Sequence, residues 1–217
     1  MPTEFTLPLI VVLALVVGVG FMVAQRQSKA RREALAKRAM LFGLTFIEST
    51  PVEELEGLSL HLFEQGSSSA AANAMSGRYR GADLVAFDFE YTTGSGKNRT
   101  THNQTVVLFR PLADRLPRFE MRPEHLFHRI GQIFGYQDID FPQHEGFSKK
   151  YLLRGEDERA VREAFRTYIL DHFQNNPGWS LESNGDALLV YRHGKKVKPE
   201  EYQKFMDEVA EIREMFR

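Results

Sequence analysis

The sequence predicts an α+β domain that is carried by one N-terminal transmembrane helix and a helical stalk. Three observations lead to this prediction: an uncharged apolar run near the N-terminus, alternating segments of β-type residues in the middle of the chain, and apolar residues at helical spacing toward the C-terminus. Strands cluster before helices, without regular β-α-β alternation. We therefore expect a mainly antiparallel sheet with C-terminal helices, and not a doubly wound nucleotide-binding fold.

The apolar run occupies residues 5–24, where no side chain is ionisable, and residues 9–17 are entirely aliphatic. Twenty helical residues rise about 30 Å, the thickness of the hydrocarbon core of a bilayer. We therefore assign residues 1–24 as a transmembrane anchor. A cleaved signal peptide and a buried core helix are the alternatives. The first lacks the usual basic residues before the run, and the second seldom continues this long without a polar residue.

A basic segment follows the anchor. Residues 25–38 carry six basic groups and one acidic group, whereas residues 39–217 carry a net charge of −5. Because basic residues stay on the cytoplasmic side, we expect the N-terminus outside and the domain in the cytoplasm, at the inner membrane of a cell. The acidic domain disfavours nonspecific binding to nucleic acid. The basic segment should contact anionic lipid headgroups through Arg26, Lys29, Arg31 and Arg32.

Good helix formers continue the anchor through residues 25–43, which we interpret as a basic helical stalk that ends at Gly43. The soluble domain then spans residues 44–217. Its first part alternates as half-buried strands do, apart from a stretch rich in Ser and Ala for which we expect a loop, with a short Ala helix as the alternative. The expected strands are 44–47, 58–63 and 74–79, and the expected loop is 64–73.

The clearest local signal is a β-hairpin. Residues 83–91 alternate aromatic and polar side chains, residues 99–109 are rich in β-branched types, and a glycine-rich turn at 94–98 joins them. The turn contains Gly-Ser-Gly-Lys but lacks the spacing, the hydroxyl residue and the following helix of a phosphate-binding loop. Lys97 and Arg99 at this tip are instead candidates for contact with lipid headgroups.

The C-terminal part combines short strands with amphipathic helices. A curved sheet closed by a C-terminal helix, reminiscent of pleckstrin-homology-like domains in layout, is one arrangement that fits. The expected strands are 118–121, 150–154, 179–182 and 187–192, and the expected helices are 124–134, 156–175 and 199–217. The expected buried faces of the last two helices are Val161, Phe165, Tyr168, Ile169 and Phe173, and then Tyr202, Phe205, Val209, Ile212 and Phe216.

Candidate catalytic and metal-binding residues are few. The sequence contains no cysteine, which excludes disulfides and thiolate chemistry. His125 and His128 share one face of the expected helix at 124–134, but no recognised zinc spacing is present, so we expect no metal and no cofactor. The remaining candidates are His144 or Glu145 as a third metal ligand, and Asp138 with Asp140, or Asp88 with Glu90, as acid–base pairs.

Parts of the chain resemble conserved hypothetical bacterial proteins that pair one membrane helix with a soluble domain. The resemblance lies in the Arg/Ala-rich stalk running into Gly-Leu-Thr-Phe at 43–46, in Tyr-Thr-Thr-Gly-Ser-Gly-Lys-Asn at 91–98, and in Tyr-Leu-Leu-Arg-Gly at 151–155. It implies a single-pass topology, and it implies no activity, ligand or catalytic residue.

These observations favour a noncatalytic interaction or scaffolding domain that is held at the membrane, where anchoring raises its effective concentration for membrane partners. The expected partners are the lipid bilayer and other membrane proteins. Two alternatives stay open: an enzyme with an acid or histidine site near residues 124–145, and a domain that binds anionic lipid headgroups.

Overall fold

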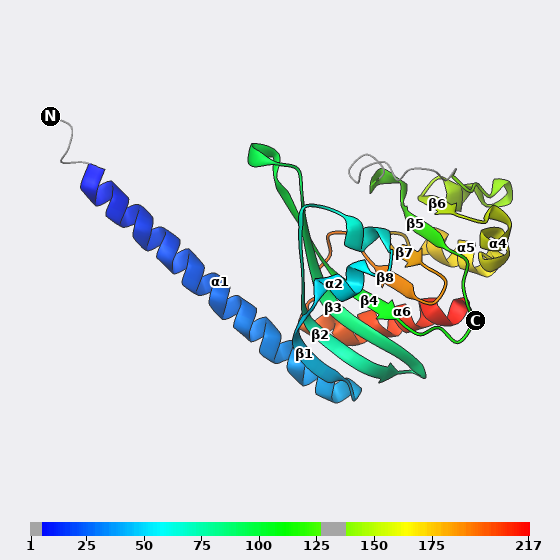
Figure 1. The fold of residues 1–217 in the computed structure, drawn as a ribbon, viewed down its shortest axis with the longest axis horizontal. Helices are drawn as coiled ribbons and strands as arrows, with labels where there is room; N and C mark the ends of the chain where they lie inside the picture. The colour runs from blue at the N-terminus through cyan, green and yellow to red at the C-terminus, as the bar shows by residue number, and fades with distance from the viewer. Residues whose placement is uncertain (1–5, 127–137) are drawn as a thin grey trace.

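The computed structural model describes residues 6–126 and 138–217, with side chains described from residue 15 onward. Within these ranges the chain forms an α+β fold around one eight-stranded antiparallel sheet, with helices toward the C-terminus (Figure 1). The strand order is β1-β2-β3-β4-β8-β7-β5-β6. This architecture confirms the predicted fold class at the level of α+β with a mainly antiparallel sheet. The pleckstrin-homology-like layout stays a prediction.

Most strands lie where residue alternation predicted them. Two expectations were wrong. Residues 58–63 do not form a strand, because Ser59 has a φ of +51° that breaks an extended chain. The expected loop at 64–73 belongs to a strand from Ser68 onward, paired on both sides. The strands are β1 (Thr45–Thr50), β2 (Ser68–Tyr79), β3 (Ala82–Thr93), β4 (Thr100–Phe109), β5 (Phe119–Pro123), β6 (Tyr151–Gly155), β7 (Ser180–Ser183) and β8 (Leu188–Tyr191).

Helix α1 (Thr6–Phe42) is 37 residues long and projects away from the sheet at its N-terminal end (Figure 1). It ends before Gly43, whose φ of +68° confirms the predicted stop. Its last turns are part of the packed domain, since Leu35 and Ala39 are fully buried against the sheet. Among the described residues, no helix combines the length and the hydropathy needed to cross a bilayer. Residues 1–5 of the expected anchor, and the side chains of residues 6–14, lie outside the part of the chain that the structure describes.

Two short helices, α4 (Glu158–Ala164) and α5 (Thr167–Asn175), replace the single helix expected from residue 156 to 175. The break occurs because Phe165 and Arg166 leave the helical conformation while Phe165 stays buried. After the break the helical register changes, so Tyr168 is 47% exposed and not buried as expected.

The last helix, α6 (Tyr202–Met215), begins after a 3₁₀ turn η5 (Pro199–Glu201) and buries Tyr202, Phe205, Val209 and Ile212, as predicted, while Phe216 is partly buried. Of the helix expected at 124–134, only the 3₁₀ turn η3 (Glu124–Leu126) lies within the described residues. The remaining short elements are α2 (Val52–Glu56), η1 (His61–Glu64), η2 (Gly96–Asn98), η4 (Pro142–His144) and α3 (Glu145–Ser148).

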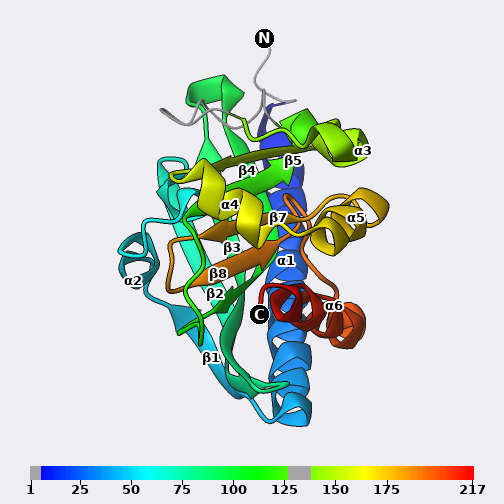
Figure 2. The ribbon, with the colours of Figure 1, turned by 90° about the vertical axis from the view of Figure 1, so that its right-hand side faces the viewer.

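Both faces of the sheet are covered over much of its area. One face packs against α1, α4, α5 and α6, with α4 and α5 at the end of the molecule farthest from the N-terminus of α1 (Figures 1 and 2). The other face carries Phe87, Phe89 and Tyr91 of β3, which form an aromatic cluster with Phe63 of η1 and are covered by the segment that contains α2 and η1. This second cover stops short of β5 and β6.

Candidate functional site

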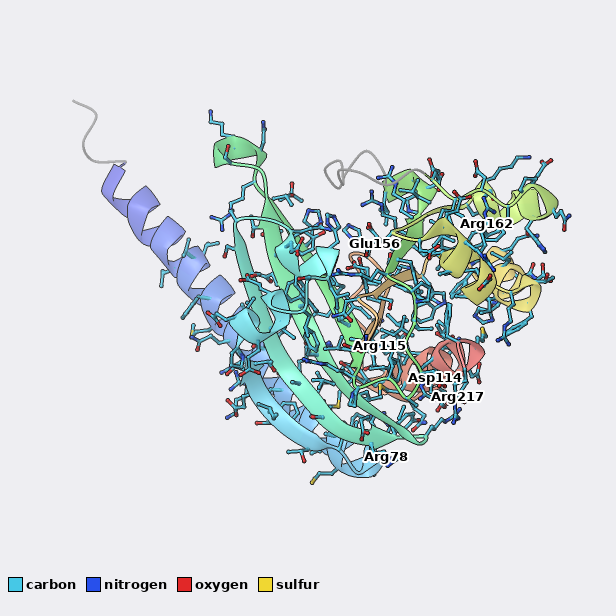
Figure 3. The ribbon with its side chains drawn as sticks, turned by 45° about the vertical axis from the view of Figure 1, so that its right-hand side comes forward. Arg78, Asp114, Arg115, Glu156, Arg162 and Arg217 are labelled. Carbon is cyan, nitrogen blue, oxygen red and sulfur yellow. The ribbon has the colours of Figure 1, made fainter. Side chains whose placement is uncertain are left out.

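A pocket of about 300 Å³ lies where the α2–η1 segment stops, over the ends of β5, β6 and β7. Its walls come from three neighbouring strands, from η1 and from the loops beside them. The residue Glu156, at its rim, is labelled in Figure 3, between the cyan segment that carries η1 and the yellow-green helix α4. The lining residues are Ser59, Leu60, His61, Glu64, Arg118, Phe119, Glu120, Arg154, Gly155, Glu156, Glu182 and Ser183.

Three ionisable residues form a row across the floor of this pocket. Glu120 on β5 stands directly opposite Glu182 on β7 and Arg154 on β6 in the strand register. Side chains alternate between the faces of a strand, so the burial of Met121 and Leu181 in the helix-covered core directs the two glutamates to the opposite face. The row therefore follows from the strand order β7-β5-β6.

Glu182 is the most deeply buried carboxyl group of the row, with 2% of its surface exposed. Its Oε2 accepts a hydrogen bond from the Leu62 backbone N–H at 3.1 Å, and its Oε1 accepts one from the Tyr191 hydroxyl at 2.9 Å. Burial, reinforced by the nearby charge of Glu120, raises the pKa of Glu182 to about 8. Glu182 therefore keeps its proton at neutral pH.

Glu120 has counter-charges that Glu182 lacks. Burial raises the pKa of Glu120 as well, but Arg122 and Arg154 act in the opposite direction. The Nη1 of Arg122 lies 3.4 Å from Glu120 Oε1, and the Arg122 side chain is almost completely buried. The pair therefore places the buried guanidinium of Arg122 beside the carboxyl group of Glu120 in the pocket floor.

Several polar groups around this row make no hydrogen bond within the described part of the chain. They are the three guanidinium nitrogens of Arg122, the Nε2 of His61 and the hydroxyl of Tyr91. Burial, and then the charge of Arg122, lowers the pKa of His61 to about 4, so its ring is neutral near pH 7. A buried polar group without a partner costs about 1–3 kcal/mol. The cluster thus holds hydrogen-bonding capacity that the fold itself does not use.

Among the sequence candidates near 124–145, Asp138 has a pKa raised by burial, and it lies close enough to Asp140 and Glu124 for their charges to add to the rise. His144 and Glu145 have separate partners. Asp138 accepts a hydrogen bond from the Leu153 N–H at 3.1 Å, His144 lies 3.4 Å from Asp171, and the exposed Glu145 pairs with Lys149. His128 lies outside the described residues. Among the residues that are described, no group of three histidine, aspartate or glutamate side chains is arranged to hold a metal ion.

The two members of the candidate pair differ in burial: Asp88 is buried and accepts several hydrogen bonds, whereas Glu90 is exposed. Arg31 of α1 donates to both carboxylate oxygens of Asp88, at 2.8 and 2.7 Å, and donates to the Val197 carbonyl at 2.8 Å. Asn73 and Thr105 donate to the same carboxylate. These contacts of Asp88 with Arg31, Asn73 and Thr105, which we call the Asp88 hub, join α1, the sheet and the loop before α6.

The residues predicted to contact lipid headgroups fall into two places. Four lie on α1, where Arg31 is occupied by Asp88, Arg32 pairs with Glu48 at 2.9 Å and Lys29 lies 3.9 Å from Glu33. Lys97 and Arg99 lie exposed at the tip of the β3–β4 hairpin. Headgroup contact by all six residues stays a prediction: Arg26, Lys29, Arg31, Arg32, Lys97 and Arg99.

Sequence reasoning missed the pocket over β5–β7. Glu120 on β5 lies between two apolar residues, in Phe-Glu-Met, and Glu182 on β7 follows an apolar residue, in Leu-Glu-Ser. That pattern also fits a strand with one solvated face, so only the strand order and the cover by η1 reveal that Glu182 is buried and that Glu120 is partly buried.

Comparison with known proteins gives one informative likeness. No family model matches the chain, and no curated protein matches it. A crystal structure of the mycobacterial trehalose monomycolate transport factor A, TtfA, superposes with a TM-score of 0.64. The match covers 88% of this chain and 96% of that chain at 13% sequence identity. At this sequence identity, the similarity between the two proteins concerns the fold alone.

Proposed function

We propose that this chain is a membrane-anchored accessory protein whose domain binds other proteins at the cytoplasmic face of a membrane and performs no catalysis. The observation that carries the proposal is the surface of α1. Large apolar side chains cover the helix between Leu15 and Val23, and each is at least 47% exposed. Apolar surface of this extent is unfavourable in water and favourable in lipid. The anchor comprises this stretch together with the apolar residues that precede it in the sequence.

The attachment of α1 to the domain supports the same proposal. The helix that carries the exposed apolar stretch continues without a break into Arg31, Leu35 and Ala39, which bind or pack against the sheet. A domain joined in this way keeps a constant orientation relative to the anchor. That arrangement suits a protein that presents one surface to a neighbouring membrane protein.

The structural similarity to TtfA supports a general class of function for this chain. The protein with the similar crystal structure is a transport factor for trehalose monomycolate. For this chain we propose only the corresponding class, an accessory factor that works beside a membrane machinery. The basic residues after the anchor support a cytoplasmic location for the domain.

The test is membrane retention of the full chain. Replacing Val17 and Phe21 by Asp should release the protein into the soluble fraction after a carbonate wash, because charged groups inside a bilayer are costly. A matched control replaces Met40 and Leu41, which are 73% and 75% exposed on the same helix, by Asp. The control protein should stay in the membrane. Release of the wild-type chain, or retention of the Val17/Phe21 variant, would contradict the anchor.

Partner binding needs its own measurement. Crosslinking in native membranes, followed by mass spectrometry, should recover the same membrane protein reproducibly with the wild-type chain and lose it with the released variant. Turnover of a substrate by the purified chain, without a reproducible partner, would contradict the noncatalytic role.

A second candidate function is contact with anionic lipid headgroups, favoured by the position of the hairpin tip. The β3–β4 hairpin extends beyond the sheet on the same side as the N-terminal end of α1 (Figures 1 and 2). Lys97 and Arg99 are exposed there. If α1 enters the bilayer, these two cations face its surface, where each contributes about 1 kcal/mol.

The absence of cysteine makes this candidate directly testable. An environment-sensitive fluorophore attached through Asn98→Cys should shift to the blue when the chain is placed in phosphatidylserine nanodiscs. In phosphatidylcholine nanodiscs, or with Lys97→Glu and Arg99→Glu added, the shift should disappear. A shift that ignores both the lipid charge and these substitutions would rule out headgroup recognition by the tip.

A further inference from the structure

The pocket over β5–β7 has the features of a ligand site, and it lies on a part of the domain that the anchor does not use. It opens beside the α2–η1 segment, whereas α1 is held by the Asp88 hub on the helix-covered face. Its volume of about 300 Å³ is at the lower end of the range for small-molecule sites. A small molecule with both polar and apolar groups would fit a cavity lined in this way.

The unused hydrogen-bonding groups argue that the cavity is completed by something polar. The guanidinium of Arg122 does not line the pocket, but its Nη1 lies 3.4 Å from Glu120 Oε1, and none of its nitrogens makes a hydrogen bond within the described residues. The Nε2 of His61, on the pocket wall, is also without a partner there. Native proteins seldom leave several such groups together, because each costs about 1–3 kcal/mol.

The balance of charge limits the kind of ligand. The pocket is lined by the carboxylates of Glu64, Glu120 and Glu156 and by the guanidinium groups of Arg118 and Arg154, with Arg122 buried behind them. The three carboxylates and the three guanidinium groups cancel in formal charge, and two pairs of opposite sign lie close together: Arg118 with Glu156, and Arg122 with Glu120. A ligand with a full charge of either sign therefore meets as much repulsion as attraction.

A hydroxyl group can bind where charges of both signs lie close together, because it both donates and accepts hydrogen bonds. It can donate to a carboxylate and accept from a guanidinium in the same position, and such charge-assisted bonds are the strong ones. Ser59 and Ser183 add further hydroxyls to the lining, and Leu60 and Phe119 add apolar surface for C–H groups.

We propose that the pocket over β5–β7 binds a neutral polyhydroxylated small molecule of the sugar class, held between Glu120 and Arg154. Glu120 accepts from one ligand hydroxyl and Arg154 donates to its neighbour. Glu182, the buried member of the row, accepts a hydrogen bond from the Leu62 backbone N–H and so holds the η1 backbone at the pocket wall.

The test uses the full chain in lipid nanodiscs, which avoids detergents with sugar headgroups. Binding of glucose, galactose, maltose and myo-inositol is measured by saturation-transfer NMR and titration. At least one of them should bind saturably, and Glu120→Gln should weaken that binding at least about tenfold, the loss expected for a hydrogen bond to a charged group. Glu163→Gln, on the exposed side of α4, is the matched control and should bind as the wild type does.

The fluorescence of Trp179, the single tryptophan, reports whether each variant is folded. If Glu120→Gln does not fold, Arg154→Lys at the partly exposed end of the row replaces it, and the same tenfold weakening is expected. Three results would overturn the proposal: no binding of any of the four compounds, unchanged binding by the folded variants, or tighter binding of inorganic phosphate or putrescine. The first would indicate that water alone fills the cavity.

Discussion

The guanidinium of Arg31 on α1 forms a bidentate ion pair with the carboxylate of Asp88 on β3, although the two residues are 57 positions apart in the sequence. Arg31 Nε lies 2.8 Å from Asp88 Oδ2, and Arg31 Nη2 lies 2.7 Å from Asp88 Oδ1. Asp88 is nearly inaccessible to solvent, and Lys196 approaches the same carboxylate at 3.5 Å. This pair fixes the helix that we propose as an anchor to the sheet that forms the domain. Its energetic importance can be measured.

Replacing Asp88 by Ala should destabilise the fold by about 3–5 kcal/mol, because the Arg31 guanidinium would remain partly buried without a counter-charge. The control is Glu48→Ala, which removes the exposed pair between Arg32 and Glu48 and should cost about 0–1 kcal/mol. Denaturant unfolding followed by Trp179 fluorescence measures both. Equal losses for the two variants would mean that the Asp88 hub is not what holds α1.

The packing of α1 predicts a second contrast on the same helix. Leu35 is fully buried against the sheet, whereas Leu41 is 75% exposed. Leu35→Ala should cost about 2–5 kcal/mol through lost burial and the remaining cavity. Leu41→Ala should stay within about 0.5 kcal/mol of the wild type. If Leu35→Ala had no effect on unfolding, the last turns of α1 would not belong to the folded domain in solution.

The buried carboxyl group of Glu182 predicts a specific dependence of stability on pH. Its pKa is raised from an ordinary value of 4.5 to about 8, so the folded state binds a proton that the unfolded state releases between these values. The contribution of Glu182 to stability is therefore complete below pH 4.5 and is lost as the pH rises toward 8, by up to about 1.4 kcal/mol per pH unit.

Glu182→Gln removes this titration while keeping an oxygen that can accept from the Leu62 N–H. The variant and the wild type should be similarly stable near pH 4.5, and the variant should be the more stable one at pH 8. Denaturant unfolding at several pH values provides the comparison. Parallel curves over this range would show that Glu182 titrates normally.

Two glycines in the hairpin turn provide a steric test. Gly94 and Gly96 both have positive φ, but an added Cβ at Gly94 would lie 2.3 Å from the Asn98 carbonyl oxygen, and one at Gly96 would meet no atom within 4 Å. Gly96→Ala should therefore cost about 1 kcal/mol from backbone strain alone. Gly94→Ala should cost clearly more and loosen the turn, which hydrogen exchange at residues 92–100 would detect. Similar exchange in both variants would contradict the tight turn.

Much of the fold was predictable because its elements are locally encoded. Helix α6 buries one face at helical spacing, the β7–β8 hairpin surrounds a Ser-Asn-Gly-Asp turn, and α1 stops at Gly43. In each case the deciding residues lie within a few positions of one another, so periodicity and turn chemistry are sufficient.

The errors occurred where tertiary contacts override local preference. The Ser- and Ala-rich start of β2 is extended because β1 and β3 pair with it on both sides, although alanine and serine are not strong strand formers. Residues 58–63 alternate like a strand but lie over the aromatic cluster as a turn and a 3₁₀ helix. Burial of Phe165 likewise divides the expected helix into α4 and α5.

The sequence by itself determined the apolar run before residue 25, the basic segment after it, the lack of cysteine and most of the individual strands and helices. Tertiary structure alone decided that Arg31 meets Asp88 and that Glu120 stands between Glu182 and Arg154. The reason is physical. Local patterns depend on the period of one element, whereas the meeting of distant side chains depends on strand order and on which element covers each face of the sheet.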